Sequence, residues 1–498
     1  MNSLYNLFVS VCERSGDSIA LIYHNRTINY NTLYVNSEKM YKLLLVNGVR
    51  SGDIIGLLMR RSPNVLATML AILKIGAAYM PFNPLQTNAE WSRMIEESNC
   101  KAVIGDGDVI DRFYEGLWIE AGEFDYEVSN PNEYEHTEEN HLKNLIYVIY
   151  TSGSTGKAKG VGIRQESLYN LITYGTREIG LTEGSRIIAF SNFAFDMSVP
   201  ETIMPLLIGM SIVVLDDEEI ENPRLVCRQM QAQKVNTVLI TPTRMNLLLN
   251  CRRDTKFLQS VKYILFGAEM ISHTLIDKLK EACHAQIFNL YGPTETTAYL
   301  TYSNITNKEI IDIGVPIENT FIYLMDEDKN IVNGAGEGEI IISGIGVSDG
   351  YLSNDVVRAF KKMPELSDSY VYFTGDIAKR LENGELVYVG RCDNQIKYRG
   401  YRLGLEEIED IIRNNVKEIH DCVVHVYKKE GSEYLTMLYV AKSELEITKF
   451  KKHIAKHLVS YAIPLCLIRM DSLPLNANGK IDRRAVAEVV KEYFQSIK

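Results

Sequence analysis

Residues 145–160 read LIYVIYTSGSTGKAKG, an apolar run that passes directly into a loop of glycine, hydroxyl and lysine residues. The run Leu145–Ile149 has the length and composition of a buried strand. Glycines in the loop let the backbone approach an anion, and its amides, hydroxyls and lysines can bind phosphate oxygens. No Lys-Ser or Lys-Thr pair follows the second glycine, so this is not a GxxxxGK[ST] loop. Taken alone, the composition also fits a polar surface loop.

Helical and strand patterns alternate over the first two thirds of the chain, which predicts α/β layers. The pattern predicts an apolar helix over 64–74 and strands over 186–190, 211–215, 237–240 and 263–266. From about residue 312 the chain becomes β-rich, with strands predicted over 321–325, 337–343, 370–374 and 385–390. We therefore expect a large α/β domain with two layered subdomains and a small, β-barrel-like subdomain.

The pattern changes again after Arg391-Cys392-Asp393. A compact α+β domain is predicted there, with helices over 405–414 and 447–457 and strands over 420–427 and 435–440. We place the domain boundary at this change, which gives domains of residues 1–392 and 393–498.

Composition excludes several classes of protein. The chain has 498 residues and a net charge of −11, and no domain-sized basic tract argues for nucleic-acid binding. Its longest apolar stretches are interrupted by polar residues, and its start lacks the basic and apolar regions of a signal peptide. Eight scattered cysteines without a CxxC pair indicate reduced thiols. These features predict a cytoplasmic protein that does not bind membranes, and we expect a monomer.

Four further motifs carry polar chemistry, and each also has a simpler structural explanation. Asn289–Glu295 (NLYGPTE) offers a carboxylate for Mg²⁺, or is a plain Gly-Pro turn. Tyr372–Asp376 (YFTGD) offers an acid for ribose hydroxyls, or a turn aspartate. Gly390–Arg402 is a hinge with cations or a solvated linker, and Asn476–Lys480 (NANGK) presents an active-site lysine or an exposed one.

Read in order, these motifs resemble the adenylate-forming superfamily. The matching segments are YTSGSTGKAKG, FDMS at Phe195–Ser198, NLYGPTE, the glycine-rich Gly338–Leu352, YFTGD, GRCDNQIKYRGYR and PLNANGK. Within it, the chain is most similar to adenylation domains of nonribosomal peptide synthetases and to free-standing amino acid–carrier protein ligases, including the D-alanine–carrier protein ligases. The resemblance covers nearly the whole chain. It implies that a carboxylate attacks the α-phosphate of MgATP, and that a phosphopantetheine thiol then takes the acyl group after the C-terminal domain rotates.

The resemblance also implies roles for individual residues. Lys480, Glu295 and Thr294 are implied to be catalytic, Glu295 as the Mg²⁺ ligand and Thr294 beside the α-phosphate. Asp393 is implied to be the hinge of a mobile C-terminal lid. The implied ATP-binding residues are Thr151, Ser152, Gly153, Ser154, Thr155, Gly156 and Lys159 in the phosphate loop, Asn289 and Tyr291 at adenine, and Asp376 and Arg391 at ribose.

Asp196 decides the substrate class within this resemblance. An aspartate at this place in FDxS pairs with a substrate ammonium, and a buried carboxylate left unpaired rejects acids without an amine. The alternative is a structural N-cap. The other residues implied to bind the substrate side chain are Met197, Pro200, Leu239, Ile264, Phe266, Leu290, Ala298 and Tyr299. None is charged, and the bulk of Phe266, Leu290 and Tyr299 predicts a small apolar amino acid such as alanine or glycine.

Several residues depart from the family pattern. Ala158 replaces a proline, Asn83 stands where an acid is common, and Gly404 occupies a position usually held by glutamate. Phe266 stands where the family has a small residue, and this puts D-alanine in doubt as the substrate.

We therefore expect an amino acid–carrier protein ligase that uses ATP and Mg²⁺ and serves a separate carrier protein, since no Gly-Gly-(His/Asp)-Ser carrier motif occurs in the sequence. Two alternatives stay open. One is an acyl- or aryl-CoA ligase of the same superfamily, which Asp196 argues against. The other is a noncatalytic nucleotide-binding protein, which the presence of Glu295, Asp376 and Lys480 argues against.

Overall fold

The computed structural model describes residues 3–84, 86–106, 116–128, 131, 133–151, 158–251, 254–353, 359–392, 395–399, 401–429, 432–474 and 481–496. The chain divides into two compact units. The first comprises Met1–Pro84, Asn88–Tyr150 and Lys159–Cys392, and the second comprises Leu85–Thr87, Thr151–Ala158 and Asp393–Lys498. Each unit is described by itself below.

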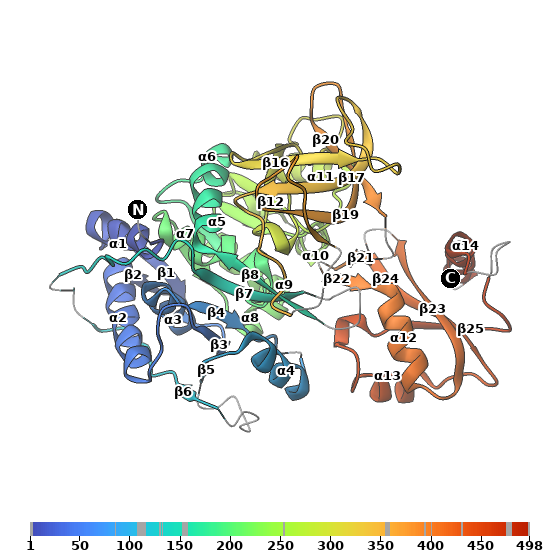
Figure 1. Ribbon diagram of the computed structural model, residues 1–498, viewed down its shortest axis with the longest axis horizontal. Helices are drawn as coiled ribbons and strands as arrows, with labels where there is room; N and C mark the ends of the chain where they lie inside the picture. The colour runs from blue at the N-terminus through green and yellow to red at the C-terminus, as the bar shows by residue number, and fades with distance from the viewer. Residues whose placement is uncertain are drawn as a thin grey trace. The chain divides into compact units, whose positions relative to one another are not determined.

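A nine-stranded sheet forms the centre of the first unit (Figure 1). Its strands, in spatial order, are β15 (Val315–Pro316), β14 (Thr301–Asn304), β13 (Gln286–Tyr291), β12 (Tyr263–Phe266), β11 (Thr237–Ile240), β9 (Arg186–Ala189), β10 (Ser211–Val214), β1 (Ile19–Tyr23) and β2 (Arg26–Asn29). The strands from β13 to β1 are parallel, which is the arrangement expected when helices connect successive strands. The predicted strands over 237–240 and 263–266 have the bounds expected.

A six-stranded sheet forms a second layer of the same unit. Its order is β6 (Trp118–Glu120), β5 (Ala102–Gly105), β3 (Ile54–Leu58), β4 (Ala78–Pro81), β7 (Leu145–Thr151) and β8 (Lys159–Arg164). The apolar strand predicted before the phosphate loop is therefore β7, with the burial of an interior strand.

Helices cover both faces of the nine-stranded sheet, and two separate apolar cores result. One core holds residues of both sheets together with α1 (Tyr5–Ser15), α2 (Tyr30–Val46), α3 (Pro63–Ile75), α5 (Gln165–Asn170) and α7 (Ile203–Leu207). The other lies beneath α9 (Pro223–Ala232), α10 (Pro242–Cys251) and α11 (His273–Ala282). The remaining helices of the unit are α4 (Asn88–Ser98), the π-helix η1 (Leu171–Gly175), α6 (Thr176–Ile179), the 3₁₀ helices η2 (Asp196–Glu201), η3 (Lys256–Leu258) and η4 (Thr294–Thr296), and α8 (Asp217–Glu221).

Helix α3 shows how local sequence sets these bounds. Pro63 occupies the first turn, where its missing N–H costs no hydrogen bond. Gly76 ends the helix with a left-handed φ of 77°. A Cβ at Gly76 would lie 2.4 Å from the His141 ring, so glycine is required there by packing as well as by φ.

The β-rich segment forms a five-stranded sheet of its own. The strands β16 (Thr320–Met325), β17 (Gly336–Gly344), β19 (Tyr370–Arg380) and β18 (Phe360–Lys362) follow in that order, and β20 (Leu386–Arg391) pairs with β19. The described strands form an open path, so the structure does not show the barrel-like closure that the sequence predicts.

The second unit contains two small sheets and the expected helices. The hairpin β21 (Gln395–Tyr398) and β22 (Tyr401–Gly404) precedes the sheet β23 (Ile419–Lys429), β24 (Ser432–Ala441) and β25 (Cys466–Met470). The helical segments are α12 (Leu405–Asn415), α13 (Ile447–Ile454), η5 (Ser460–Ala462) and α14 (Arg483–Ser496). This is the α+β character that the sequence predicts for the C-terminal region.

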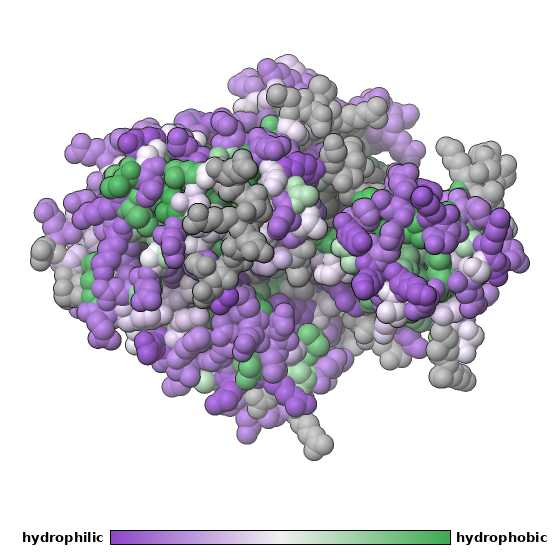
Figure 2. All heavy atoms as spheres, turned by 90° about the horizontal axis from the view of Figure 1, so that it is seen from below, coloured by the Kyte–Doolittle hydropathy of each residue, from purple (hydrophilic) through white to green (hydrophobic). Residues whose placement is uncertain are grey.

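The surface carries scattered apolar residues. The face drawn in Figure 2 is mainly hydrophilic with small hydrophobic areas, as expected when apolar side chains are taken into the cores. Among the helices that the structure describes, none has the length and apolar character needed to cross a bilayer.

Candidate active site

Asp376 is the centre of a buried polar group on β19. Its carboxylate accepts a hydrogen bond of 2.7 Å from the Tyr291 hydroxyl and forms an ion pair with Arg391. The Tyr388 hydroxyl lies 3.5 Å from the same carboxylate. Arg391 stands directly opposite Asp376 in the β19–β20 register. Burial, and then the charge of Asp376, hold the pKa of Tyr291 well above its usual value. The structure thus brings together three residues that the sequence assigned to ATP.

Glu295 belongs to a second buried group at η4. The side chain is 1% exposed, and its carboxylate accepts a hydrogen bond of 2.6 Å from the Tyr351 hydroxyl. Lys159, at the start of β8, places its ammonium 5.1 Å from the centre of the Tyr351 ring. The structure therefore joins Lys159 and Glu295 through Tyr351. Sequence reasoning did not single out Tyr351. The only signal for a role of this residue was that it lies within the motif Gly338–Leu352.

The segment between β13 and β14 is a tight turn that carries several predicted residues. Thr297 and Ala298 have left-handed φ values of 71° and 59°, an unfavourable conformation for residues with a side chain. The Thr297 hydroxyl donates to the Gly346 carbonyl over 2.7 Å, and the Glu295 carbonyl accepts from the Ser348 amide. These contacts hold the strained backbone and so set the place of Glu295.

Gly292 makes this turn possible, and its replacement is expected to disrupt the site. A Cβ at Gly292 would lie 2.6 Å from Tyr299 Cα and 2.8 Å from the Ala298 carbonyl oxygen. Because both are backbone atoms, the turn must move to accept Gly292→Ala. We expect a loss of stability of about 1–3 kcal/mol and a fall of about 100-fold in the rate of ATP–pyrophosphate exchange. Denaturant titration and exchange assays measure the two effects.

Gly122→Ala is a matched control, since a Cβ at Gly122 would meet no atom within 4 Å. Equal behaviour of the two variants would show that the close approach at Gly292 does not matter.

Five of the predicted substrate residues belong to one core or pack against it, and two of these approach Gly267. A Cβ at Gly267 would lie 3.7 Å from Met197 Cε and 4.0 Å from the Leu290 carbonyl oxygen. Leu239, Leu290 and Tyr299 belong to the core between the sheets, and Met197 and Ala298 pack against it. Pro200 is buried within η2.

Ile264 and Phe266 differ from the sequence prediction. Both are fully buried in the core beneath α9, α10 and α11, on the other face of the sheet. Leu265 faces the same core as Leu239, its partner in the β11–β12 register. The physical reason is the alternation of side chains along a strand, because a shift of one residue exchanges the two faces. Leu265 and Gly267, rather than Ile264 and Phe266, lie on the side of the predicted substrate residues.

Asp196 begins η2, and its charge acts on the Tyr147 hydroxyl. Burial, followed by the charge of Asp196, holds the pKa of Tyr147 well above its usual value. The hydroxyls of Tyr147 and Tyr299 are buried and have no hydrogen-bond partner among the described residues. Unpaired buried hydroxyls are costly, so they mark places where a ligand gains from binding.

Glu201, at the end of η2, is fully buried. It accepts hydrogen bonds from the Phe190 and Ser191 amides and from the Ser191 hydroxyl, at 3.0, 2.7 and 2.8 Å. Burial nevertheless raises the pKa of Glu201 from 4.5 to about 7, because desolvation of the carboxylate outweighs these bonds.

A dependence of stability on pH follows. Since the folded state binds the Glu201 proton more tightly than the unfolded state, this group destabilises the fold progressively as pH rises from about 4.5 to about 7. Glu201→Gln removes the titration but keeps the hydrogen bonds. The variant is expected to gain about 2 kcal/mol relative to wild type between about pH 5 and about pH 7.5. Denaturant titrations at several pH values measure this difference, and parallel stability curves would contradict it.

Some of the predicted residues lie outside the described part of the chain. They are Ser152, Gly153, Ser154, Thr155, Gly156, Asp393 and Lys480.

Three further predicted residues lie at the ends of strands or at the start of a helix. Thr151 is the last residue of β7, and Thr294 opens η4. Asn289, on β13, donates from its side-chain amide to the Asp312 carbonyl over 2.7 Å.

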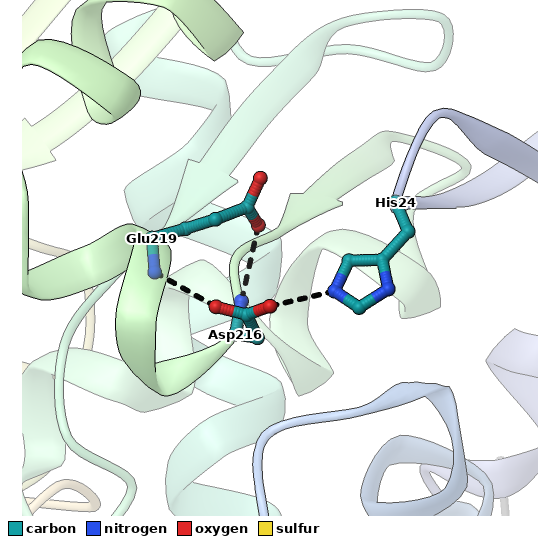
Figure 3. A group of neighbouring side chains, drawn as sticks. All are labelled: His24, Asp216 and Glu219. Carbon is teal, nitrogen blue, oxygen red and sulfur yellow. Dashed lines mark hydrogen bonds and ion pairs between the residues drawn. The ribbon is translucent and has the colours of Figure 1, made fainter.

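A separate polar group, His24, Asp216 and Glu219, has the ligand atoms of a metal site (Figure 3). Its oxygens already have protein partners. Asp216 caps α8 by accepting from the Glu219 amide and from His24, while Glu219 accepts from the Asp216 amide and from Gln229. This capping box at the start of α8 explains why the side chains of Asp216 and Glu219 lie close together.

Comparisons with known proteins agree with this architecture. Residues 8–352 match the family model described as AMP-binding enzyme. Tyrocidine synthase 1 of Brevibacillus parabrevis is 30% identical over 98% of this chain, which spans 45% of that protein. The adenylation domain AlmE of Vibrio cholerae, solved with glycyl-adenosine-5'-phosphate, is 19% identical with a TM-score of 0.84 over 99% and 98% of the two chains. o-Succinylbenzoate CoA synthetase of Bacillus subtilis is 20% identical with a TM-score of 0.82 over 97% and 98%.

A chain with these sheets and with this match over residues 8–352 is an adenylate-forming enzyme. It belongs to the AMP-binding enzyme family, and its relatives include nonribosomal peptide synthetases.

Proposed function

We propose that this protein activates an amino acid with ATP and transfers it to the phosphopantetheine thiol of a carrier protein. The observation that supports this most is Asp196, an acid whose charge acts on the buried Tyr147 hydroxyl and which directly precedes Met197, a residue that approaches Gly267. An acid there suits a substrate that carries an ammonium group next to its carboxylate.

In the first half-reaction, a carboxylate oxygen of the amino acid attacks the α-phosphorus of ATP. The bond from the α-phosphorus to the bridging oxygen breaks, and the products are an aminoacyl adenylate and pyrophosphate. In the second half-reaction, the thiol sulfur attacks the carbonyl carbon. The thiol loses its proton, AMP leaves, and a thioester forms.

Individual residues of this chain take separate tasks. Asp376 and Arg391 hold the ribose, Tyr291 and Asn289 border the adenine, and the loop 151–159 holds the outer phosphates. Lys480 stabilises the charge that develops on the phosphate, and Asp393 is the hinge for the second half-reaction. Glu295 provides the buried carboxylate oxygen that Mg²⁺ prefers, and the ion when bound supplies neutralising charge to the phosphates.

The substrate side chain is proposed to be apolar, since no charged residue lies among Met197, Leu239, Leu265 and Gly267. A small side chain was predicted from the bulk of Phe266, Leu290 and Tyr299. Phe266 faces the other core, whereas Leu290 and Tyr299 belong to the core that holds Leu239. Gly267 adds no side chain on the substrate side, so we propose an apolar amino acid without the earlier restriction to alanine or glycine.

The test is amino-acid-dependent exchange between pyrophosphate and ATP. We expect exchange with one or a few apolar amino acids, its loss in Lys480→Ala, and formation of a thioester on a phosphopantetheine carrier. Exchange only with acids that lack an amine, unaffected by Asp196→Ala, would establish an acyl- or aryl-CoA ligase instead. ATP binding without any exchange would establish a noncatalytic nucleotide-binding protein. The fold does not separate these functions, because a CoA synthetase shares it.

A further inference from the structure

Arg61, between β3 and α3, forms hydrogen bonds with backbone carbonyls at the end of β9. The side chain is 7% exposed and satisfies its guanidinium with backbone carbonyls. It donates to the carbonyls of Ala189 and Ser191 at 2.7 and 2.6 Å, and to that of Leu215 at 3.0 Å. The guanidinium also lies 4.5 Å from the centre of the Phe193 ring. Such a planar fork holds several carbonyls in a fixed geometry, which the point charge of a lysine does not reproduce.

Glu201 binds the same stretch of backbone by accepting hydrogen bonds from its amide groups. Its Oε2 atom accepts from the Phe190 and Ser191 amides, and its Oε1 atom accepts from the Ser191 hydroxyl. Arg61 therefore holds the carbonyls and Glu201 the amides of one short stretch. The two charges also attract each other, since Arg61 favours the charged form of Glu201. A buried arginine and a buried glutamate are costly to desolvate, so their retention here points to a positional role.

Asp196 lies between the two held positions. It follows Ser191 by five residues and opens η2, the 3₁₀ helix that ends at Glu201. The Phe195 amide donates to the Asn192 carbonyl, and the Ser198 amide donates to the Phe195 carbonyl, both at 3.0 Å. The segment from Ser191 to Glu201 is thus a loop closed by the hydrogen bonds between these two residues, and Asp196 lies within it. The Glu201 side chain ties the end of η2 back to Ser191, on the other side of Asp196.

We propose that Arg61 and Glu201 are positioning residues that place the Asp196 carboxylate for the substrate ammonium. They act through the backbone at 189–191 and touch no substrate. The inference rests on the proposed function, because it assumes that Asp196 recognises an amine. A carboxylate displaced by a fraction of an ångström loses much of a charge-assisted pair, so recognition of the amino acid is the property most sensitive to this clamp.

The experiment measures KM for the amino acid, KM for ATP and kcat in the exchange reaction of the full chain. The variants are Glu201→Ala, Glu201→Gln and Arg61→Lys. Glutamine can accept both amides through its oxygen and donate to the Ser191 hydroxyl through its NH₂ group, so it is the conservative rescue. Arg186→Lys is the matched control. Arg186 also bonds a backbone carbonyl, that of Gln233 at 2.6 Å, but from the opposite end of β9.

We expect Glu201→Ala and Arg61→Lys to raise KM for the amino acid about tenfold or more while KM for ATP stays within about twofold. Glu201→Gln is expected to restore KM for the amino acid to within about threefold of wild type. Arg186→Lys is expected to leave both KM values within about twofold even where it lowers the melting temperature.

Two results would overturn the inference. One is an equal rise of both KM values in Arg61→Lys and Glu201→Ala, which indicates a general loss of structure. The other is an unchanged KM for the amino acid in both. Failure of the proposed function looks different, because wild type itself would then show no amino-acid-dependent exchange, and the inference would fall with it.

Discussion

Replacement of Asp196 by asparagine is expected to lower kcat/KM for the amino acid by about 1,000-fold. The variant keeps the shape of the side chain but removes the negative charge that pairs with the substrate ammonium. It also removes the charge that acts on the Tyr147 hydroxyl beside it. An ammonium taken out of water without a counter-charge costs several kcal/mol, so the loss is larger than that of one neutral hydrogen bond.

The measurement is pyrophosphate exchange at varied amino acid concentration, with KM for ATP followed in parallel. KM for ATP is expected to stay within about twofold, since Asp196 is not among the groups assigned to the nucleotide. Asp125→Asn is a control, because Asp125 is an exposed carboxylate paired with Lys39. An Asp196→Asn enzyme that uses the amino acid as well as wild type would show that Asp196 does not recognise the substrate ammonium.

Replacement of Asp376 by alanine is expected to lower kcat/KM for ATP by about 100-fold or more. Three side chains converge on this carboxylate, Tyr291 and Arg391 closely and Tyr388 at 3.5 Å. Its removal takes this carboxylate away from the Arg391 guanidinium, whose side chain is only 9% exposed. A loss of stability of about 3 kcal/mol is therefore expected as well.

The ribose assignment has a sharper test than the rate alone. Wild type is expected to use ATP better than its 2′-deoxy and 3′-deoxy analogues, and Asp376→Ala is expected to lose most of this preference. Tyr388→Phe is the matched control, since it removes only the longest of the three contacts. Undiminished discrimination between the nucleotides in Asp376→Ala would place the ribose elsewhere.

The helices and strands that local pattern predicted are all present in the structure. The strands over 237–240 and 263–266 have the predicted bounds. Helix α3 differs from prediction by one residue at each end, and α12 differs by one residue at its C-terminal end. These segments have strong apolar periodicity or clear turn residues at their ends, which act over a few neighbours along the chain. The π-helix at 171–175 was not predicted, because its hydrogen bonds differ from those of an α-helix by only one residue.

The partners of the predicted site residues could not be read from the sequence. Tyr351 and Glu295 are 56 residues apart in the chain and share a hydrogen bond. Arg61 bonds a carbonyl 130 residues away. No local signal marks either Arg61 or Glu201, since an arginine before a helix and a glutamate at the end of one are common on surfaces. Only their burial and their hydrogen bonds in the tertiary structure show that both hold the backbone at 189–191.

The sequence by itself determined the layered α/β class, the order of the elements and the family resemblance, because these depend on local periodicity and on motifs of neighbouring residues. Only the tertiary structure decided which face of β12 meets the substrate residues. Both faces of this strand are buried, so Ile264, Leu265 and Phe266 are all apolar and alternation cannot be seen in their composition. The choice between Phe266 and Gly267 was made by the packing of α9, α10 and α11 against one face and of Met197 against the other.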